Sequence, residues 1–307
     1  IVYYHVWDNY PYPTYNRQHY LSNDAIATIS KVTDDIVKTV APEVKSKYIP
    51  HAVQADVFVP HEEKDKKEYK KNVMKMPNGE DRFIFFWNNR NARRKQSGSL
   101  LFWYKELLNK IGDDKTCLLM HTDVKDVHGQ DLQKIIENLG MTNGEVMFSA
   151  QKLPSEGLAK LYNLADCTIN VSDAEGFGLA TLESLSCATP IIATMTGGLQ
   201  EQVTDGKDFF GIGLEPASKA IIGSQEIPWI YEDRLNGDDV VAAMQKMVEM
   251  PKEEREALGQ AGREHVLKNY NFETFENTWV DFVGEVLKEN GSWSDRKNYS
   301  SWTLKEL

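Results

Sequence analysis

Short apolar runs rich in Val, Ile and Phe alternate along the chain with longer segments whose apolar residues recur at helical spacing. Runs of the first kind are typical of buried strands, and segments of the second kind are typical of amphipathic helices. The pattern predicts strands at residues 1–5, 25–30, 83–88, 116–121, 146–149, 167–171 and 191–194. Strands that alternate with helices usually form parallel sheets covered on both faces, so the expected fold class is α/β.

Helical patterns lie between most of these strands and fill the C-terminal part of the chain. They span residues 31–40, 100–110, 132–138, 155–163, 179–187, 238–250, 252–269 and 272–289. The last stretch of the chain also carries three tryptophans, Trp279, Trp293 and Trp302. Aromatic side chains of this kind usually pack on another surface, so we expect this end of the chain to contact a second part of the molecule.

One highly charged segment, residues 61–81, interrupts the alternation. It ends in a Pro-Asn-Gly turn, directly before the strand with the strongest pattern. It is either a solvated helix followed by a loop or a connector between two α/β domains. The connector is favoured because a complete strand–helix series can begin immediately after it.

Composition narrows the class of protein. The 307 residues are 41% hydrophobic and 26% charged, which is typical of a folded globular chain. The net charge of −11 disfavours nucleic acid and anionic membranes as partners. The cysteines Cys117, Cys167 and Cys187 are odd in number and lie in apolar surroundings, which disfavours a disulfide framework or a zinc site. No apolar run approaches 18 residues, so we expect a cytoplasmic location.

The segment SDAEGFGLATLESLSCATPIIAT, residues 172–194, carries the clearest chemical signal. It follows a predicted strand, Gly176 and Gly178 flank Phe177, and a helix is predicted to begin near Leu179. A glycine turn that opens a helix at the carboxyl end of a strand favours phosphate binding, because free N–H groups and the helix dipole both face the anion.

Two acids, Glu175 and Glu183, flank the start of this helix. On one continuous helix they would lie roughly 80° apart, but the loop lets Glu175 reach over the mouth of a site while Glu183 points in from the helix. Carboxylates accept hydrogen bonds from paired sugar hydroxyls, so the two acids could hold a ribose and a second sugar. The alternative, favoured for any bare pair at this spacing, is a helix-terminal acid and an unrelated surface glutamate.

The surrounding residues decide between these alternatives. The run EGFGL-x3-E-x6-P-IIAT, followed by TGGLQEQVTDG at residues 196–206, resembles the retaining glycosyltransferases of family 4, which have the GT-B fold. YIPHAVQADVFVP and LYNLADCTINVS resemble further segments of that family. The resemblance covers roughly residues 25–206. It implies a doubly wound, Rossmann-like donor-binding domain at 82–270, a linker at 61–81, a remnant of a second Rossmann-like domain at 1–60, and a helix at 271–307 that returns toward that remnant.

The resemblance also implies roles for individual residues. Glu175 would contact the donor sugar and Glu183 the ribose hydroxyls, and the backbone around Gly176, Phe177, Gly178 and Leu179 would face the diphosphate. In the basic loop NNRNARRKQSG, Arg90 and Lys95 match the family's cations, which stabilise the leaving diphosphate in place of a metal. Asn89 replaces the usual Gly and Arg93 and Arg94 are extra, so which basic residue makes which contact stays open. A solvated basic loop is the alternative.

Other candidates rest on weaker signals. The loop that contains Gln151, Lys152 and Leu153 borders the base in family members. His5, at the end of the first strand, matches an active-site histidine near the transferred sugar, although a lone histidine there is more often structural. The loop at residues 121–128 holds two histidines and two aspartates, which solvated turns explain better than a metal site. The chain has no Asp-x-Asp pair, so no metal is expected.

These observations predict a glycosyltransferase that moves a sugar with retention from a UDP- or GDP-linked donor to a hydroxyl of a glycan, lipid or other acceptor. The leaving phosphate would assist removal of the acceptor proton. Because the part before the linker is short, the alternative is a nucleotide-sugar-binding module without activity, and self-association through residues 1–30 is expected. A GT-B epimerase or phosphorylase fits less well, since the lysine-cofactor context of a phosphorylase is missing.

Overall fold

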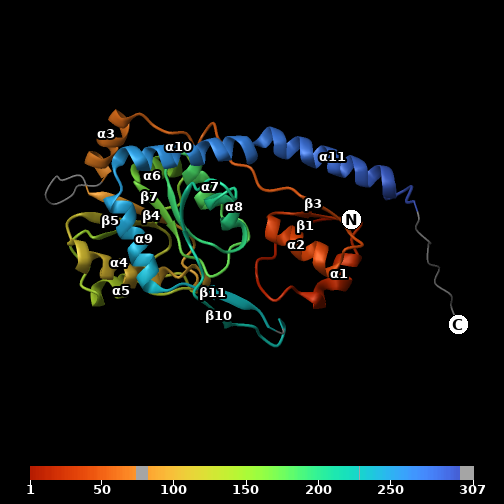
Figure 1. Cartoon of the computed structure of the whole chain (residues 1–307), viewed down its shortest axis with the longest axis horizontal. Coiled ribbons are helices and arrows are strands. Elements are labelled where there is room, and N and C mark those ends of the chain that lie inside the picture. The colour runs from red at the N-terminus through yellow and green to blue at the C-terminus, as the bar shows by residue number, and fades with distance from the viewer. Residues whose placement is uncertain (74–81, 228, 298–307) are drawn as a thin grey trace.

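A six-stranded parallel sheet forms the centre of the larger part of the molecule (Figure 1). The computed structural model describes residues 1–73, 82–227 and 229–297. The strand order is β6–β5–β4–β7–β8–β9, so the chain moves outward from β4 in one direction and from β7 in the other. The strands are β4 (Phe83–Asn88), β5 (Thr116–His121), β6 (Val146–Ser149), β7 (Cys167–Asn170), β8 (Ile191–Thr194) and β9 (Gly211–Leu214).

Helices cover both faces of this sheet, because its strands are apolar on both sides. In β4, Phe85 and Trp87 face one cluster and Ile84 and Phe86 face the other. The first cluster includes side chains of α4 (Ser97–Ile111), α5 (Leu132–Asn138) and α9 (Gly237–Glu249). The second includes side chains of α6 (Ser155–Leu164), α7 (Leu179–Ser186), α8 (Gln200–Val203) and α10 (Lys252–Asn269).

A smaller parallel sheet, of order β1–β2–β3, forms the N-terminal part of the chain. Its strands are β1 (Val2–His5), β2 (Ala25–Thr28) and β3 (Lys45–Tyr48), and the short helices η1 (Thr14–Asn16) and α1 (Arg17–Leu21) join the first two. Helix α2 (Lys31–Val40) is capped by Ser30, whose side chain accepts a hydrogen bond from the Thr33 N–H at 3.1 Å. The apolar side of α2 covers one face of this sheet.

The C-terminal helix α11 (Phe272–Asn290) follows α10 and covers the other face of the small sheet (Figure 1). The Trp279 ring packs edge-on against Tyr4, with the ring centroids 5.2 Å apart. Trp279 therefore packs on a second part of the molecule, as predicted. The prediction is wrong for Trp293, which is 95% exposed beyond the end of the helix, and Trp302 lies outside the described residues.

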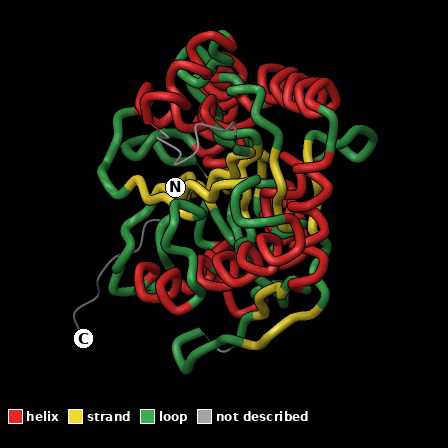
Figure 2. The backbone as a smooth tube through the Cα atoms, turned by 90° about the vertical axis from the view of Figure 1, so that its left-hand side faces the viewer, coloured by secondary structure: helices red, strands yellow, loops and turns green. Residues whose placement is uncertain are grey.

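The charged segment before β4 contains helix α3 (Glu63–Val73), and its predicted Pro-Asn-Gly turn lies outside the described residues. All seven predicted strands are present, to within two residues. The pattern missed β3 and β9, since KSKY is polar and GIGL is half glycine. It also missed the antiparallel hairpin of β10 (Ser218–Ile221) and β11 (Tyr231–Arg234), which extends away from the main sheet (Figure 2).

Among the described residues, none of the helices combines the length and the apolar character that a membrane span requires.

Candidate functional site

A cavity of about 590 Å³ lies at the carboxyl ends of β4 and β7, where the strand order of the large sheet reverses. Such a reversal opens a crevice between neighbouring loops, which is where α/β proteins commonly bind ligands. The part of the chain built on the six-stranded sheet, called the large domain below, supplies Asn89, Arg90, Arg94, Lys95, Asn170, Ala174, Glu175, Gly176, Phe177, Gly178, Leu179 and Ala180. The part built on β1–β3, called the small domain below, supplies Val6, Asp8, Asn9 and Ile29, and His51 lies on the segment that leaves it.

The predicted glycine turn forms one wall of this cavity. Gly178 has a φ of 93° and directly precedes α7, and a side chain at this position would place its Cβ 2.4 Å from Leu199 Cδ2. The short helix η3 (Gly197–Leu199) packs against the turn, and the Gly198 N–H donates to the Glu175 carbonyl at 3.0 Å. The first N–H groups of α7 have no intrahelical partner, so they are available to an anion in the cavity.

Opposite charges meet at the centre of the cavity. Lys95, the last residue of the short helix η2 (Arg93–Lys95), forms a salt bridge with Glu175, and their side chains are only 10% and 13% exposed. Burial lowers the pKa of Lys95, and the nearby Glu175 carboxylate opposes that shift. From the small domain, Asp8 faces this pair, and burial raises its pKa although Arg94 acts to lower it. Two cations and two carboxylates therefore lie close together in a region that is largely shielded from solvent.

Two amide groups in the cavity wall have a donor without a partner. Asn170, at the end of β7, is 1% exposed, and its Oδ1 accepts hydrogen bonds from the backbone and hydroxyl of Ser172 at 3.2 and 2.5 Å. Its Nδ2 is buried and unpaired within the described part of the chain, and the same holds for Asn89 Nδ2. A buried unpaired donor costs about 1–3 kcal/mol, so both groups favour a ligand rich in acceptor oxygens.

The four cations of the basic loop after β4 differ in how they lie relative to the cavity. Arg90 lies at the rim, where its Nε and Nη2 donate to Asp126 at 2.6 and 3.1 Å. Arg93 points toward β11 and pairs with both oxygens of Glu232 at 2.7 and 2.8 Å. Arg94 donates to the Ala174 carbonyl beside Glu175. Of the four cations in this loop, Arg94 and Lys95 lie inside the cavity, Arg90 lies at its edge and Arg93 points away.

Glu183 lies behind this cavity and does not line it. Its carboxylate accepts a hydrogen bond from the Tyr162 hydroxyl at 2.7 Å, and that hydroxyl accepts one from Asn88 Nδ2 at 2.8 Å. Burial raises the pKa of Glu183 to about 7, while the Tyr162 hydrogen bond opposes the shift. The two predicted acids therefore occupy different surroundings, with Glu175 in the cavity and Glu183 in a polar network under it.

Three other predicted residues lie outside the cavity lining. Lys152 is exposed, and Leu153 packs against the core below the start of α6. His5 is buried, and its Nε2 forms a hydrogen bond of 2.7 Å with the Tyr20 hydroxyl. Burial lowers the pKa of His5 to about 4. Of the two interpretations given above for His5, this placement fits the structural one.

The sequence analysis missed Asp8, His51 and Asn170. Val6, Asp8 and Asn9 follow β1 and line the cavity, whereas His5 points into the small domain because successive side chains of a strand face opposite sides. The available signal was a polar pair, Asp8 and Asn9, directly after a predicted strand. Within the residues that the structure describes, no group of three His, Cys, Asp or Glu side chains is placed so that it could hold a metal ion.

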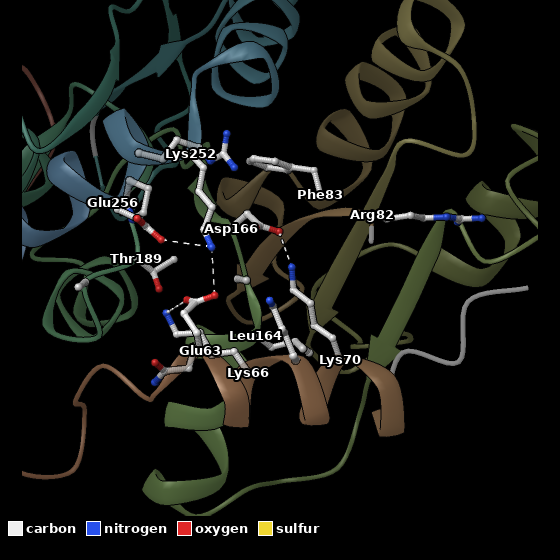
Figure 3. Close-up of a pocket in the computed structure, with 16 residues that line it drawn as sticks. Glu63, Lys66, Lys70, Arg82, Phe83, Leu164, Asp166, Thr189, Lys252 and Glu256 are labelled. Carbon is white, nitrogen blue, oxygen red and sulfur yellow. Dashed lines mark hydrogen bonds and ion pairs between the residues drawn. The ribbon is translucent and has the colours of Figure 1, made fainter. Parts of the chain in front are cut away.

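A second cavity, of about 260 Å³, lies at the opposite, amino ends of β4, β7 and β8 (Figure 3). Lys252 at the start of α10 reaches Glu63 of α3 at 3.1 Å and Glu256 at 3.4 Å. Lys70 of α3 pairs with Asp166 at 3.1 Å (Figure 3). These side chains are already paired with one another. The cavity therefore lies where ion pairs attach α3 to the large domain.

Comparison with known proteins gives both the family and the fold. The model of the family "Glycosyl transferases group 1" matches residues 65–265, which is more than half of the chain. The D-inositol 3-phosphate glycosyltransferase of Thermomonospora curvata is 36% identical over 94 residues, which cover 30% of this chain and 21% of that protein. The enzyme of the same name from Corynebacterium jeikeium is 34% identical over 121 residues, which cover 38% and 28%. The matched segments thus span about a quarter of these relatives' length.

Solved structures resemble the chain over most of its length. A glycosyltransferase from Rickettsia africae superposes with a TM-score of 0.72 at 17% identity, over 94% of this chain and 70% of that one. Anabaena HepE in complex with UDP and glucose gives 0.70 at 13%, over 92% and 71%. Sucrose-phosphate synthase from Thermosynechococcus elongatus gives 0.70 at 20%, over 89% and 61%. These similarities confirm the predicted GT-B type of α/β fold. The family model, which matches more than half of the chain, shows that the chain belongs to the group 1 glycosyl transferases.

Proposed function

We propose that the cavity at the carboxyl ends of β4 and β7 binds a nucleoside diphosphate sugar, and that the protein transfers this sugar to an acceptor hydroxyl with retention at the anomeric carbon. The observation that carries the proposal is the unpaired Asn170 donor, which faces the same cavity as the α7 N-terminus, Arg94 and Lys95. A diphosphate satisfies all of these groups at once. The named relatives are glycosyltransferases and Anabaena HepE binds UDP, so UDP is the favoured nucleotide.

Donor binding begins with an exchange of partners. In the structure, Lys95 neutralises Glu175. When the diphosphate enters, Lys95 turns to its oxygens, and Glu175 is released to accept hydrogen bonds from the hydroxyls of the transferred sugar. Arg90 gives up its exposed pair with Asp126 and adds a third cation at the rim. Glu183 accepts from the ribose hydroxyls after its Tyr162 partner moves aside.

The chemical step needs stabilisation of a leaving group more than it needs a nucleophile. The acceptor oxygen forms a bond to the anomeric carbon on the face from which the donor leaves. The bond between that carbon and the diphosphate oxygen breaks, and its electron pair stays on the diphosphate. The acceptor proton passes to an oxygen of the leaving phosphate. Lys95, Arg94 and the α7 N-terminus stabilise the charge that develops there.

Because Lys95, Arg94, Arg90 and the α7 N-terminus would all contact the diphosphate, the proposed reaction needs no divalent ion. We expect UDP to bind with the same affinity in EDTA as in Mg²⁺. A large loss of affinity on chelation, measured by titration calorimetry, would contradict this part of the proposal.

The proposal is tested first by a thermal-shift panel of UDP-, GDP- and ADP-sugars. A ligand present at 100 times its dissociation constant adds about 2.7 kcal/mol to the free energy of unfolding. We expect UDP-sugars to raise Tm most, and an absence of any shift would contradict the proposal. Turnover is then measured on the same preparation with hydroxyl acceptors. Tight donor binding without turnover would favour a nucleotide-sugar-binding module instead.

A further inference from the structure

Aromatic side chains gather where the segment after β1 meets the β10–β11 hairpin. The hairpin is anchored there by its backbone: the Tyr231 N–H donates to the Tyr10 carbonyl, and Asn9 Nδ2 donates to the Tyr231 carbonyl at 3.3 Å. The contact joins residues more than 200 positions apart in the sequence. We call this group the aromatic seam, and it consists of Tyr10, Tyr12, Trp229 and Tyr231.

The rings of the seam are arranged in pairs. Tyr10 and Tyr12 stack with their centroids 5.7 Å apart, and Trp229 lies 5.9 Å from Tyr231. Lys219 of β10 places its Nζ 4.4 Å from the centre of the Tyr10 ring, so a cation lies beside the stack. Trp229 is 49% exposed. A half-exposed indole among other rings leaves apolar surface available for a ligand.

The seam continues directly from the donor cavity. Asp8 and Asn9 line that cavity, and the next residue in the chain is Tyr10. Asp8 lies close enough to Arg94 and Glu175 for both to affect the charge on its carboxyl group. A ligand on the seam would therefore have one end beside Asp8, where the proposed donor sugar meets the small domain.

We propose that the aromatic seam is the acceptor subsite and that its ligand is a carbohydrate, with one sugar ring against the exposed Trp229 beside the Tyr10–Tyr12 stack and one hydroxyl beside Asp8. This inference rests on the proposed function, because it names the acceptor of the same reaction. A sugar ring has a face of C–H groups and a rim of hydroxyls. Tyr and Trp offer the matching combination of an apolar ring and a polar tip. A lipid chain would instead favour an aliphatic surface, whereas every member of the seam carries a polar group.

The test separates acceptor binding from donor binding. UDP affinity is measured by calorimetry, and binding of the methyl glycosides of glucose, galactose and mannose is measured by saturation-transfer NMR in the presence of UDP. The variants are Trp229→Ala and Tyr10→Leu, and the second keeps the backbone anchor of the hairpin. Trp293→Ala is the matched control, since Trp293 is an exposed tryptophan at the far end of the chain. Circular dichroism checks that each variant is folded.

We expect at least one glycoside to bind the unchanged protein and to bind either seam variant about tenfold more weakly, with UDP affinity unchanged. The control should bind both ligands normally. Equal glycoside binding in all variants would overturn the inference, and so would no glycoside binding by a protein that binds UDP. If UDP itself does not bind, the proposed function fails rather than the acceptor assignment.

Discussion

The two cavities at opposite ends of the six-stranded sheet both contain lysine, arginine and glutamate side chains, but these side chains differ in how fully they are paired. The amino-end cavity has the larger number of lysines and arginines, yet Lys70 and Lys252 are each matched by a carboxylate. The carboxyl-end cavity has fewer cations, but it buries a Lys–Glu pair and leaves the Asn170 donor unpaired. Unmet hydrogen-bonding capacity therefore distinguishes the proposed binding site from the other cavity better than the number of charges does.

The direction of the chain explains this difference. In a parallel sheet with crossover helices, the helices that follow the strands begin near the carboxyl ends, so their free N–H groups and positive dipole ends gather there. Helix α7 begins in this way behind Gly178. At the amino ends the chain enters the strands from helix C-termini and linkers. There Lys70 and Lys252 have carboxylates as partners, and both ion pairs connect α3 to neighbouring elements.

The largest expected effect comes from removing the buried cation. We predict that Lys95→Met weakens UDP binding about 100-fold, because a charge-assisted hydrogen bond contributes about 1.5–3 kcal/mol and the Glu175 charge is left unpaired beside the phosphates. The matched control is Lys70→Met at the other end of the sheet, which should leave UDP affinity unchanged. Calorimetric titration measures both. Equal losses in the two variants would remove the distinction between the cavities.

A second expectation concerns the glycine turn. Gly178 and Gly206 have nearly the same φ, 93° and 94°, but an added Cβ meets Leu199 only at Gly178 and open space at Gly206. Each Gly→Ala change costs about 1–2 kcal/mol of unfolding free energy for the left-handed backbone. Only Gly178→Ala should also weaken UDP binding, by about tenfold, since it displaces the N–H groups of the turn. Normal UDP affinity in Gly178→Ala would show that the turn does not hold the phosphates.

The third expectation is a pH dependence through Glu183, whose pKa burial raises to about 7 from an ordinary 4.5. Only the ionised form accepts both ribose hydroxyls, so affinity for UDP-glucose, whose diphosphate keeps its charge over this range, should fall about eightfold from pH 7.5 to pH 6. The change Glu183→Gln should abolish this slope. The folded protein binds this proton more tightly than the unfolded chain does, so the contribution of Glu183 to stability is full below pH 4.5 and is lost as the pH rises through 7. An unchanged slope in the variant would exclude Glu183 as its source.

The smallest expected effect is at the amino-end cavity. Lys252→Ala breaks exposed ion pairs with Glu63 and Glu256, and such pairs contribute about 0–1 kcal/mol. Tm should therefore fall by at most about 4 °C, and UDP affinity should not change. The Tm effect should diminish in high salt, which screens exposed charges. A loss of UDP binding in this variant would mean that the two ends of the sheet are coupled.

Much of the secondary structure of this protein is determined by residues that lie close together in the sequence. The seven predicted strands and the helices between them follow from the spacing of apolar side chains, which each segment carries by itself. The turn before α7 follows from glycine's tolerance of positive φ, which Gly178 adopts at 93°. The predictions failed where such local signals are absent, as in the polar strand β3 and the glycine-rich β9.

The partner of each charged group was decided only by the tertiary structure. Sequence analysis placed Lys95 and Glu175 in one site but could not show that they pair, that Glu183 turns to Tyr162, or that Asp8 enters the cavity from the other domain. Hydrogen bonds and ion pairs form only at short range, and the distances between these side chains depend on how two sheets and their loops pack. The sequence around a residue indicates which chemical group it offers, whereas the packing of distant segments determines which partners that group contacts.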